Sequence, residues 1–341
     1  FAAEQFVIFT PAGNHFPLIA NGVPCPIYVD SSEDKGVMIA VGNLQQDILQ
    51  VCGTKPVLLT NVSSKHCVIV GTYSTPFVKK LIAANKIDKK ELEGKNEKYI
   101  LQVVTNPCEG VDEAVVIIGS DRRGTIYGIY ELSEQIGVSP WYWWADVPIR
   151  KQQNVYVKPG QYTDGEPAVT YRGIFLNDED WGLTPWASQT FEPERGNIGP
   201  RTYAKVCELL LRLKANYLAP AMHPVSTSFN QIPENKLVAD TFAIVMGSTH
   251  CEPLLLNTAS EWDTQTMGPW NYDKNKEGIN RVLTQRVREN SPYENVYTLA
   301  LRGLHDGAMS TTLPMHEKVR MLQQALLDQR QILAENIDRP V

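Results

Sequence analysis

The sequence predicts a mixed α/β protein in two parts: an α+β domain at residues 1–165, then the first half of a (β/α)8 TIM-type barrel at residues 166–341. The length of 341 residues exceeds that of one average domain. Short β-rich runs separated by turn residues fill the first part. Beyond residue 169, predicted strands and helices alternate along the chain.

The first part contains apolar and β-branched runs that are typical of strands. The predicted strands cover residues 6–10, 37–41, 57–60, 67–71, 99–104 and 114–119. Helices are predicted at 74–84 and 121–136, the second with Asp121 as its N-cap and Gly137 as its stop. Strands mixed with helices in this way predict one packed sheet.

The segment SPWYWWADVP at residues 139–148 is too aromatic for a solvated linker. We expect it either to pack between the two parts or to line a cleft, because large aromatic rings bury much apolar area.

The second part repeats a strand–helix unit four times. Strands are predicted at 171–176, 215–219, 243–247 and 296–301, and helices at 200–213, 236–242, 274–289 and 315–335. Such alternation predicts parallel strands with right-handed crossovers. A doubly wound sheet and half of a barrel both fit this pattern. Polar clusters directly after each strand favour the barrel, whose active sites lie at the carboxyl ends of the strands. Because half a barrel exposes two strand edges, we expect the native chain to continue beyond residue 341.

The composition argues against several classes of function. The net charge is −6 and the isoelectric point is near 5.6, so neither nucleic acid nor an anionic membrane is an expected partner. No apolar run approaches the ~20 residues that span a bilayer. The six cysteines lack metal-knuckle and redox spacings, and free buried thiols are expected. Phosphate-loop and nucleophile-elbow patterns are absent as well, so we expect neither cofactor nor metal.

Two polar clusters suit recognition of an acidic sugar. Asn177 and Asp178 begin the run NDEDW, which has three acidic residues and ends at Trp181. Carboxylates accept hydrogen bonds from vicinal sugar hydroxyls, and an indole offers an apolar face on which a sugar can stack. An acidic loop that caps a helix or binds calcium is the alternative. After the fourth predicted strand, the guanidinium of Arg302 suits a uronate carboxylate, unless it only forms a surface salt bridge. Asp306 is a candidate general base or hydroxyl acceptor, or it only holds Arg302 in place.

Two histidines follow the middle strands. His223 is either a ligand-facing donor or a loop residue without a role. His250 and Cys251 are adjacent, so only one of them faces the barrel mouth, and we expect that residue to be His250. A cysteine nucleophile would also need a partnered base.

Several long motifs resemble glycoside hydrolase family 115. They are GSDRRGTIYGIYELS at 119–133, SPWYWWADVP at 139–148, YRGIFLNDEDWG at 171–182, MGSTHCEP at 246–253 and LRGLHDG at 301–307. The resemblance implies an inverting hydrolase that removes α-linked glucuronic acid, with or without a 4-O-methyl group, from xylan or another plant glycan. It also implies a periplasmic or extracellular location. The assembly state stays open, with a homodimer as one form considered.

The same resemblance implies roles for individual residues. Asn177 and Asp178 would contact the sugar, with Asp178 also a candidate catalytic carboxylate. His250 and Arg302 would bind the uronate, and Asp306 would lie in or beside that site as the second catalytic candidate.

The resemblance implies a role for one more residue, and the sequence differs from the family pattern at two points. Glu134, on the last helix of the first domain, would reach the cleft. His223 stands where family members often carry an aromatic residue, which puts a xylan substrate in doubt. The family's general acid, a Glu after the fifth barrel strand, would lie beyond residue 341. Inverting hydrolysis needs two carboxylates about 6.5–9.5 Å apart, so we expect this stretch alone to be inactive.

Three other functions fit parts of the sequence. A carbohydrate-binding or scaffold protein would keep the acidic, aromatic site without a general acid. An oxidoreductase or transferase on a doubly wound sheet would need the missing phosphate loop. An N-acetylhexosamine hydrolase would give Arg302 no anion to bind.

Overall fold

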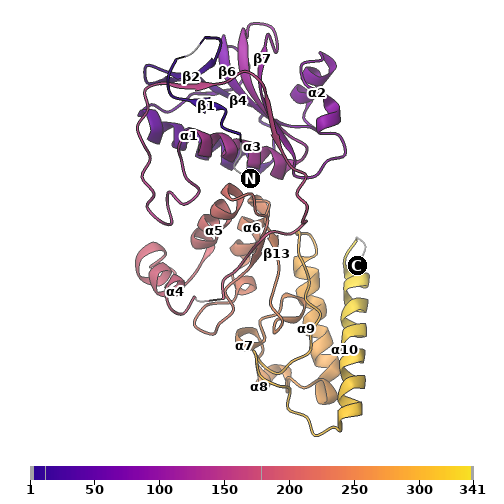
Figure 1. The fold of residues 1–341 in the computed structure, drawn as a ribbon. Helices are drawn as coiled ribbons and strands as arrows, with labels where there is room; N and C mark the ends of the chain where they lie inside the picture. The colour runs from indigo at the N-terminus through magenta and orange to yellow at the C-terminus, as the bar shows by residue number, and fades with distance from the viewer. Residues whose placement is uncertain (1–3, 12, 178, 339–341) are drawn as a thin grey trace. The chain divides into compact units, whose positions relative to one another are not determined.

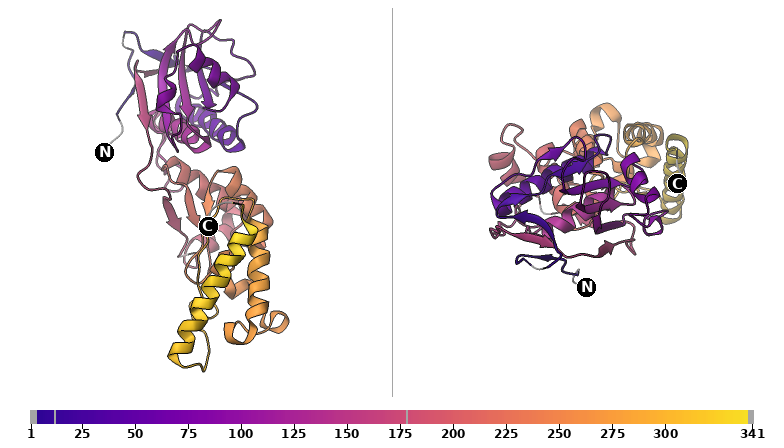
Figure 2. Two further views of the ribbon diagram at one scale, coloured as in Figure 1. Left: turned by 90° about the vertical axis from the view of Figure 1, so that its right-hand side faces the viewer. Right: turned by 90° about the horizontal axis from the view of Figure 1, so that it is seen from above.

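The computed structural model describes residues 4–11, 13–177 and 179–338. The chain divides into two compact units, the first with residues 1–170 and 209–215 and the second with residues 171–208 and 216–341. Figures 1 and 2 show the course of the chain through both. The elements confirm the predicted mixed α/β class. No described helix has the length and apolarity needed to cross a bilayer.

The first unit contains two sheets, where the sequence predicted one. The larger has the strand order β10–β7–β8–β6–β4–β5, with β7 antiparallel to both neighbours and the other pairs parallel. Its strands are β4 (Ile27–Val29), β5 (Leu58–Leu59), β6 (His66–Thr72), β7 (Tyr99–Thr105), β8 (Glu113–Gly119) and β10 (Gln161–Asp164).

The smaller sheet is antiparallel, in the order β1–β9–β2–β3. Its strands are β1 (Val7–Ile8), β2 (Phe16–Ala20), β3 (Val23–Pro24) and β9 (Val155–Val157). Asn21 and Gly22 both have positive φ, 51° and 75°, as a two-residue hairpin requires. This Asn-Gly pair was the sequence signal for the second sheet, and the one-sheet prediction overlooked it.

Three helices belong to the first unit: α1 (Lys35–Cys52), α2 (Pro76–Ala83) and α3 (Arg122–Gln135). A short 3-10 turn, η1 (Lys89–Glu91), follows α2. The helix α3 begins as predicted, because the Asp121 side chain accepts a hydrogen bond from the Gly124 N–H at 2.8 Å. Apolar side chains of α2 pack with one face of the larger sheet in a common core.

The predicted strand at 37–41 is wrong, because these residues form the first turns of α1. Asp34 caps the helix by accepting a hydrogen bond from the Gly36 N–H. The buried positions Val37, Val41, Leu44 and Ile48 then follow the helical period, which outweighs the local β-branched run.

The aromatic segment 139–148 forms turns in the first unit. The rings of Trp143 and Trp144 meet edge to face with centroids 4.9 Å apart, and the Arg212 guanidinium lies 4.8 Å from the centre of the Tyr142 ring. Trp141 stays 45% exposed. The segment therefore packs in part through its own rings.

The second unit is built on a parallel sheet of three strands, β11 (Gly173–Phe175), β12 (Tyr217–Ala219) and β13 (Val245–Met246), in that order. The helix α5 (Pro200–Arg212) connects β11 to β12, and α6 (Pro233–Thr241) connects β12 to β13. Two longer helices, α9 (Tyr272–Asn290) and α10 (Met315–Asn336), lie side by side (Figures 1 and 2). Short turns complete the unit: α4 (Leu183–Trp186), η2 (Ala187–Phe191), η3 (Phe229–Gln231), η4 (Pro253–Leu255), α7 (Thr258–Glu261) and α8 (Thr264–Met267).

The predicted strand at 296–301 is wrong. Among the described residues this segment forms no strand, and the isolated parallel bridge to Met246 is made by Asn295, one residue before the segment. Beyond it, the backbone pairs with other partners: the Thr298 carbonyl accepts from the Leu254 N–H at 3.0 Å, and Ala300 exchanges two hydrogen bonds with the Gln329 side chain. These contacts occupy backbone N–H and C=O groups that would otherwise pair with a neighbouring strand. The described residues show no closed barrel.

Candidate functional site

The predicted polar clusters follow the carboxyl ends of β11, β12 and β13 and the segment after the Asn295 bridge, all within the second unit. Carboxyl ends of parallel strands meet at one edge of a sheet, which brings their loops together. Asn177 is exposed directly after β11. Asp178 lies outside the described residues.

Three of the predicted site residues form one cluster. The Asp306 Oδ1 lies 2.9 Å from the His250 Nε2 and 2.7 Å from the Arg302 Nη1, and the Asp306 carbonyl accepts from the Arg302 Nη2 at 2.8 Å. The hydrogen bond from His250 and the charge of Arg302 lower the pKa of Asp306. All three side chains are more than one-third exposed, so the cluster is open to a ligand.

A second cluster joins the loops after β11 and β12. The Glu179 Oε1 accepts hydrogen bonds from the N–H groups of Met222 and His223, both at 2.7 Å. The His223 Nδ1 lies 3.0 Å from the Asp180 Oδ2. Glu179 is buried, so its carboxylate anchors one loop to the other and thereby fixes the place of the His223 ring.

His305 connects the two clusters. It precedes Asp306, and its ring centroid lies 5.7 Å from that of His223. Its N–H donates to the Thr258 Oγ1 at 3.0 Å, and its φ of 52° is a left-handed conformation that this hydrogen bond helps to hold. The buried Nε2 of His305 has no hydrogen-bond partner among the described residues.

The loop after β13 separates an exposed from a buried side chain. His250 is 62% exposed, while Cys251 is buried with its Sγ 3.9 Å from the Met222 Sδ and 3.2 Å from the Thr249 Oγ1. Burial raises the pKa of the Cys251 thiol, which keeps it protonated. The loop thus presents a histidine, and its cysteine is a poor nucleophile.

Glu252 ends the same loop with a buried carboxyl. Its Oε2 accepts from both the N–H and the Oγ1 of Thr249 at 3.2 Å. Burial raises the pKa of Glu252 to about 7, although these hydrogen bonds and that of Asn257 oppose the shift.

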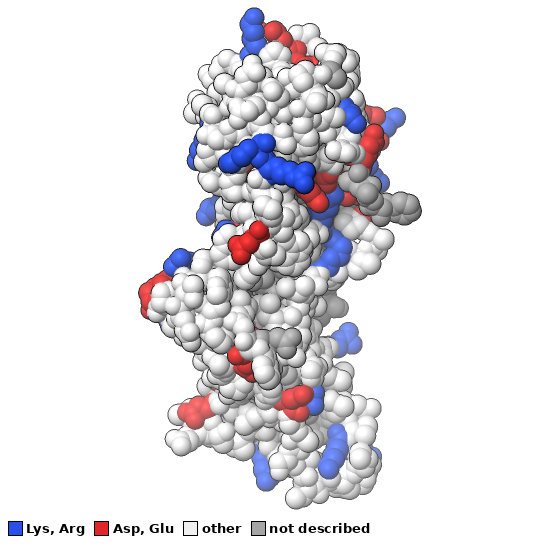
Figure 3. Space-filling model, turned by 60° about the vertical axis from the view of Figure 1, so that its left-hand side comes forward, with Lys and Arg blue, Asp and Glu red and all other residues white. Residues whose placement is uncertain are grey.

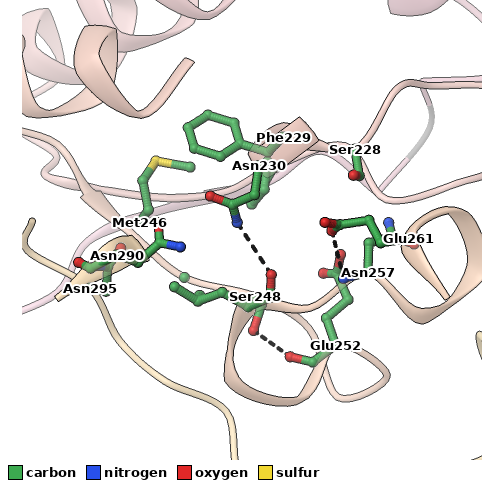
Figure 4. A pocket seen from close by; sticks show the side chains of 13 residues that line it. Ser228, Phe229, Asn230, Met246, Ser248, Glu252, Asn257, Glu261, Asn290 and Asn295 are labelled. Carbon is green, nitrogen blue, oxygen red and sulfur yellow. Dashed lines mark hydrogen bonds between the residues drawn. The ribbon is translucent and has the colours of Figure 1, made fainter. Parts of the chain in front are cut away.

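A small polar cavity adjoins Glu252 and has room for about one water molecule (Figure 4). Its lining includes the polar side chains of Ser228, Asn230, Ser248, Glu252, Asn257 and Glu261. The Ser228 Oγ and the Asn230 Oδ1 are buried without a hydrogen-bond partner among the described residues. Groups of this kind are normally satisfied by an internal water.

Glu134 lies on α3 in the first unit, apart from the other predicted site residues in the sequence. Burial and the nearby Glu131 raise its pKa, opposed in part by Lys214. Its predicted role in the cleft stays a prediction.

Charged side chains of both signs lie on the surface. On the face drawn in Figure 3, the described acidic and basic side chains are interspersed, without an extended basic patch. Within residues 4–11, 13–177 and 179–338, no three His, Cys, Asp or Glu side chains are grouped so that they could hold a metal ion.

Two positions with clear structural roles were not singled out from the sequence. Glu179 was grouped with its acidic neighbours, and Glu252 was passed over beside His250 and Cys251. Each follows a parallel strand by a few residues, and that placement was the available signal. Their roles depend on burial, which a loop sequence does not reveal.

Two sequence profiles of glycoside hydrolase families match parts of the chain. The sequence profile of glycosyl hydrolase family 115 matches residues 164–341, and that of the glycosyl hydrolase family 67 N-terminus matches residues 21–132. A comparison with curated proteins gave no match.

Two solved structures are similar to the chain. The first is a family GH115 4-O-methyl-α-glucuronidase with specificity for decorated arabinogalactans: 36% identity, TM-score 0.84, with 96% of this chain and 42% of that chain covered. The second is a GH20 β-N-acetylhexosaminidase from Streptomyces coelicolor A3(2): 12% identity, TM-score 0.50, with 96% of this chain and 62% of that chain covered. The second likeness is one of fold alone. The chain spans less than half of the length of the glucuronidase. Its family match and its identity to that enzyme show that the chain belongs to glycoside hydrolase family 115.

Proposed function

We propose that this chain belongs to an α-glucuronidase that removes glucuronic acid or its 4-O-methyl ether from a plant glycan. The observation that carries the proposal is the exposed cluster of His250, in the loop after β13, with Arg302 and Asp306. The family and the similar 4-O-methyl-α-glucuronidase support the same reaction class.

The cluster suits a uronate chemically. A guanidinium presents paired N–H donors in one plane, which match the two oxygens of a carboxylate. Arg302 uses Nη1 and Nη2 toward Asp306 and keeps other N–H groups for a ligand. His250 lies next to this fork and adds a donor from the opposite loop. A neutral hexose would offer no carboxylate to the remaining N–H groups of Arg302.

The proposed chemistry is hydrolysis with inversion, in which one carboxylate activates water and a second acid protonates the leaving oxygen. Asp306 suits the role of base, because its lowered pKa keeps it ionised at neutral pH. Asp178 is the other candidate catalytic carboxylate. Asn177 would contact the sugar, as would the indole of Trp181, which is 88% exposed. Glu134 would reach the cleft from the first domain.

We further propose that residues 166–341 form the first strand–helix units of a TIM-type barrel, preceded by an α+β domain at residues 1–165. Support comes from the parallel order β11–β12–β13, with a helix between each pair of strands. The short pairing at Asn295 stands where a fourth strand would follow.

The substrate is proposed to be a glucuronate-bearing oligo- or polysaccharide. Decorated arabinogalactan is favoured over xylan by the specificity of the similar enzyme. The His223–Asp180 pair points the same way, since it replaces an aromatic residue frequent in the family with a polar contact. Such polymers are met in the periplasm or outside the cell, where we place the protein. A homodimer is the assembly to be tested.

The test is a pair of assays on the purified protein. Isothermal titration calorimetry with glucuronic acid measures binding, and NMR of the sugar released from decorated arabinogalactan or glucuronoxylan measures turnover and anomeric configuration. The proposal expects residues 1–341 to bind glucuronate, and it expects the protein that also carries the second catalytic acid to release the β-anomer. Binding without turnover favours a carbohydrate-binding role instead. Failure of glucuronate to bind would overturn the proposal.

A further inference from the structure

Glu252 is a buried carboxyl at the end of the loop that presents His250. It is 5% exposed and lies three residues beyond Thr249, while His250 between them is open to solvent. Glu252 has no role in the proposed reaction. The hydrogen bonds of Glu252 nevertheless go mainly to residues of this loop.

Glu252 holds the turn that contains His250, and Figure 4 shows the contact between its backbone and Ser248. Its Oε2 accepts from the N–H and the Oγ1 of Thr249, each at 3.2 Å, and its own N–H donates to the Thr249 carbonyl at 3.1 Å. Its carbonyl accepts from the Ser248 Oγ at 2.8 Å. His250 therefore lies within a turn held by hydrogen bonds that involve the side chain or the backbone of Glu252.

The loop is also fixed from outside. The Thr298 Oγ1 donates to the Ser248 carbonyl at 3.1 Å, and the Thr249 Oγ1 lies 3.2 Å from the Met222 Sδ. Gly247 allows the loop to begin there, because a Cβ at this position would overlap the ring of Tyr217. These contacts fix the two ends, whereas Glu252 fixes the turn between them.

We propose that Glu252 is a positioning residue: by holding Thr249, its carboxyl fixes the turn that places the His250 Nε2 at 2.9 Å from the Asp306 Oδ1. The ligand affected is the uronate carboxylate, so the functional part of this inference rests on the proposed function. The effect runs through His250, since Glu252 itself is buried beneath the loop.

The energetic setting favours this role. A buried carboxyl is unfavourable unless it is hydrogen-bonded, and an apolar side chain would fill the space without that penalty. Glu252 has both Thr249 donors within 3.2 Å, which an apolar residue could not bind. The loss of a buried acceptor would leave these donors unsatisfied and release the turn.

The experiment compares three variants of the full protein. Glu252→Ala removes both carboxylate oxygens, and Glu252→Gln keeps one oxygen that can accept a hydrogen bond. Glu261→Gln is the matched control. The Glu261 side chain is 7% exposed and lines the same cavity, but it contacts Arg286 and the Asn257 N–H instead of the His250 turn.

Calorimetric affinity for glucuronate is the first readout. We expect Glu252→Ala to weaken binding about tenfold, Glu252→Gln to stay within about threefold of the parent, and Glu261→Gln to leave affinity unchanged even where it lowers the melting temperature. In a His250→Ala background, Glu252→Ala should weaken binding no further, because its effect acts through the lost ring. Parental affinity in Glu252→Ala overturns the proposal. The proposal also fails if Glu252→Ala weakens glucuronate binding in the His250→Ala background as much as it does in the parent.

The ring signals of His250 in ¹H–¹³C NMR are the second readout, assigned with the His250→Ala variant. We expect them to shift in Glu252→Ala and to keep their parental positions in Glu261→Gln. Glu252→Gln shows a smaller shift and serves if the Ala variant does not fold. Unmoved signals in both Glu252 variants overturn the inference. If the parent protein fails to bind glucuronate, the proposed function fails, and the NMR result still decides on Glu252.

Discussion

The buried carboxyl of Glu252 should make the stability of the second unit depend on pH in a way that Glu252→Gln removes. Burial raises the pKa of this group from its usual 4.5 to about 7. The folded state therefore holds the proton more tightly than the unfolded chain does between these two values. The stabilisation that results is fully present below pH 4.5 and is lost as the pH rises to about 7.

The magnitude follows from the two pKa values. Each unit of difference corresponds to about 1.4 kcal/mol, so the interval from 4.5 to about 7 amounts to roughly 3 kcal/mol. Of the groups around the carboxyl, Glu261 pairs with Arg286, Thr249 and Asn257 do not titrate, and burial raises the pKa of Tyr217 further above the interval.

The assay is urea unfolding of the parent and of Glu252→Gln at several pH values from 4 to 8. Fluorescence of the buried pair Trp262 and Trp270 reports on the second unit. The free energy of unfolding of the parent minus that of the variant should fall by about 3 kcal/mol between pH 4.5 and 7 and then level off. The exposed Glu277→Gln variant serves as control and should show a constant difference. A constant or rising difference for Glu252→Gln would refute the reasoning.

Three further predictions follow from the same structure. Arg302→Lys should weaken glucuronate binding about tenfold in calorimetry, because a point charge replaces a planar fork, and an unchanged affinity would exclude Arg302 from the site. Asp47→Asn should lower the free energy of unfolding of the first unit by about 3–5 kcal/mol, because it leaves the buried guanidinium of Arg212 without the carboxylate 2.9 Å away; a loss under 1 kcal/mol would contradict this. His223→Tyr removes the contact with Asp180 and should raise turnover on glucuronoxylan relative to decorated arabinogalactan, and an unchanged ratio would mean that His223 does not set specificity.

The sequence carried more information about helices and loop positions than about the number of strands. The cap of α3 at Asp121 was predictable because it is local, formed by one side chain and an N–H three residues later. The segment 37–41 was mistaken for a strand. Its short apolar run fits the two-residue period of a strand as well as the 3.6-residue period of a helix, and only the buried positions further along α1 decide for the helix. The segment 296–301 has a strand-like composition, yet distant partners such as Gln329 take its backbone groups.

The same division applies to the site. Asp306, His250 and Arg302 could be singled out because they form polar groups directly after predicted apolar runs and their chemistry suits an acidic sugar. Glu179 and Glu252 could not be given roles, because each acts through burial and through backbone N–H groups of a turn. Such contacts depend on loop conformation, which has no periodic signal in the sequence.

Recognition of a sugar carboxylate by the cluster of His250, Arg302 and Asp306 is the central claim. The most direct measurement is a calorimetric titration of the protein with glucuronate and, in parallel, with glucose, which differs in carrying a hydroxymethyl group in place of the carboxylate. We predict that glucuronate binds at least tenfold more tightly than glucose and that 1 M salt reduces this preference. Equal affinity for the two sugars, or binding of neither, would contradict it.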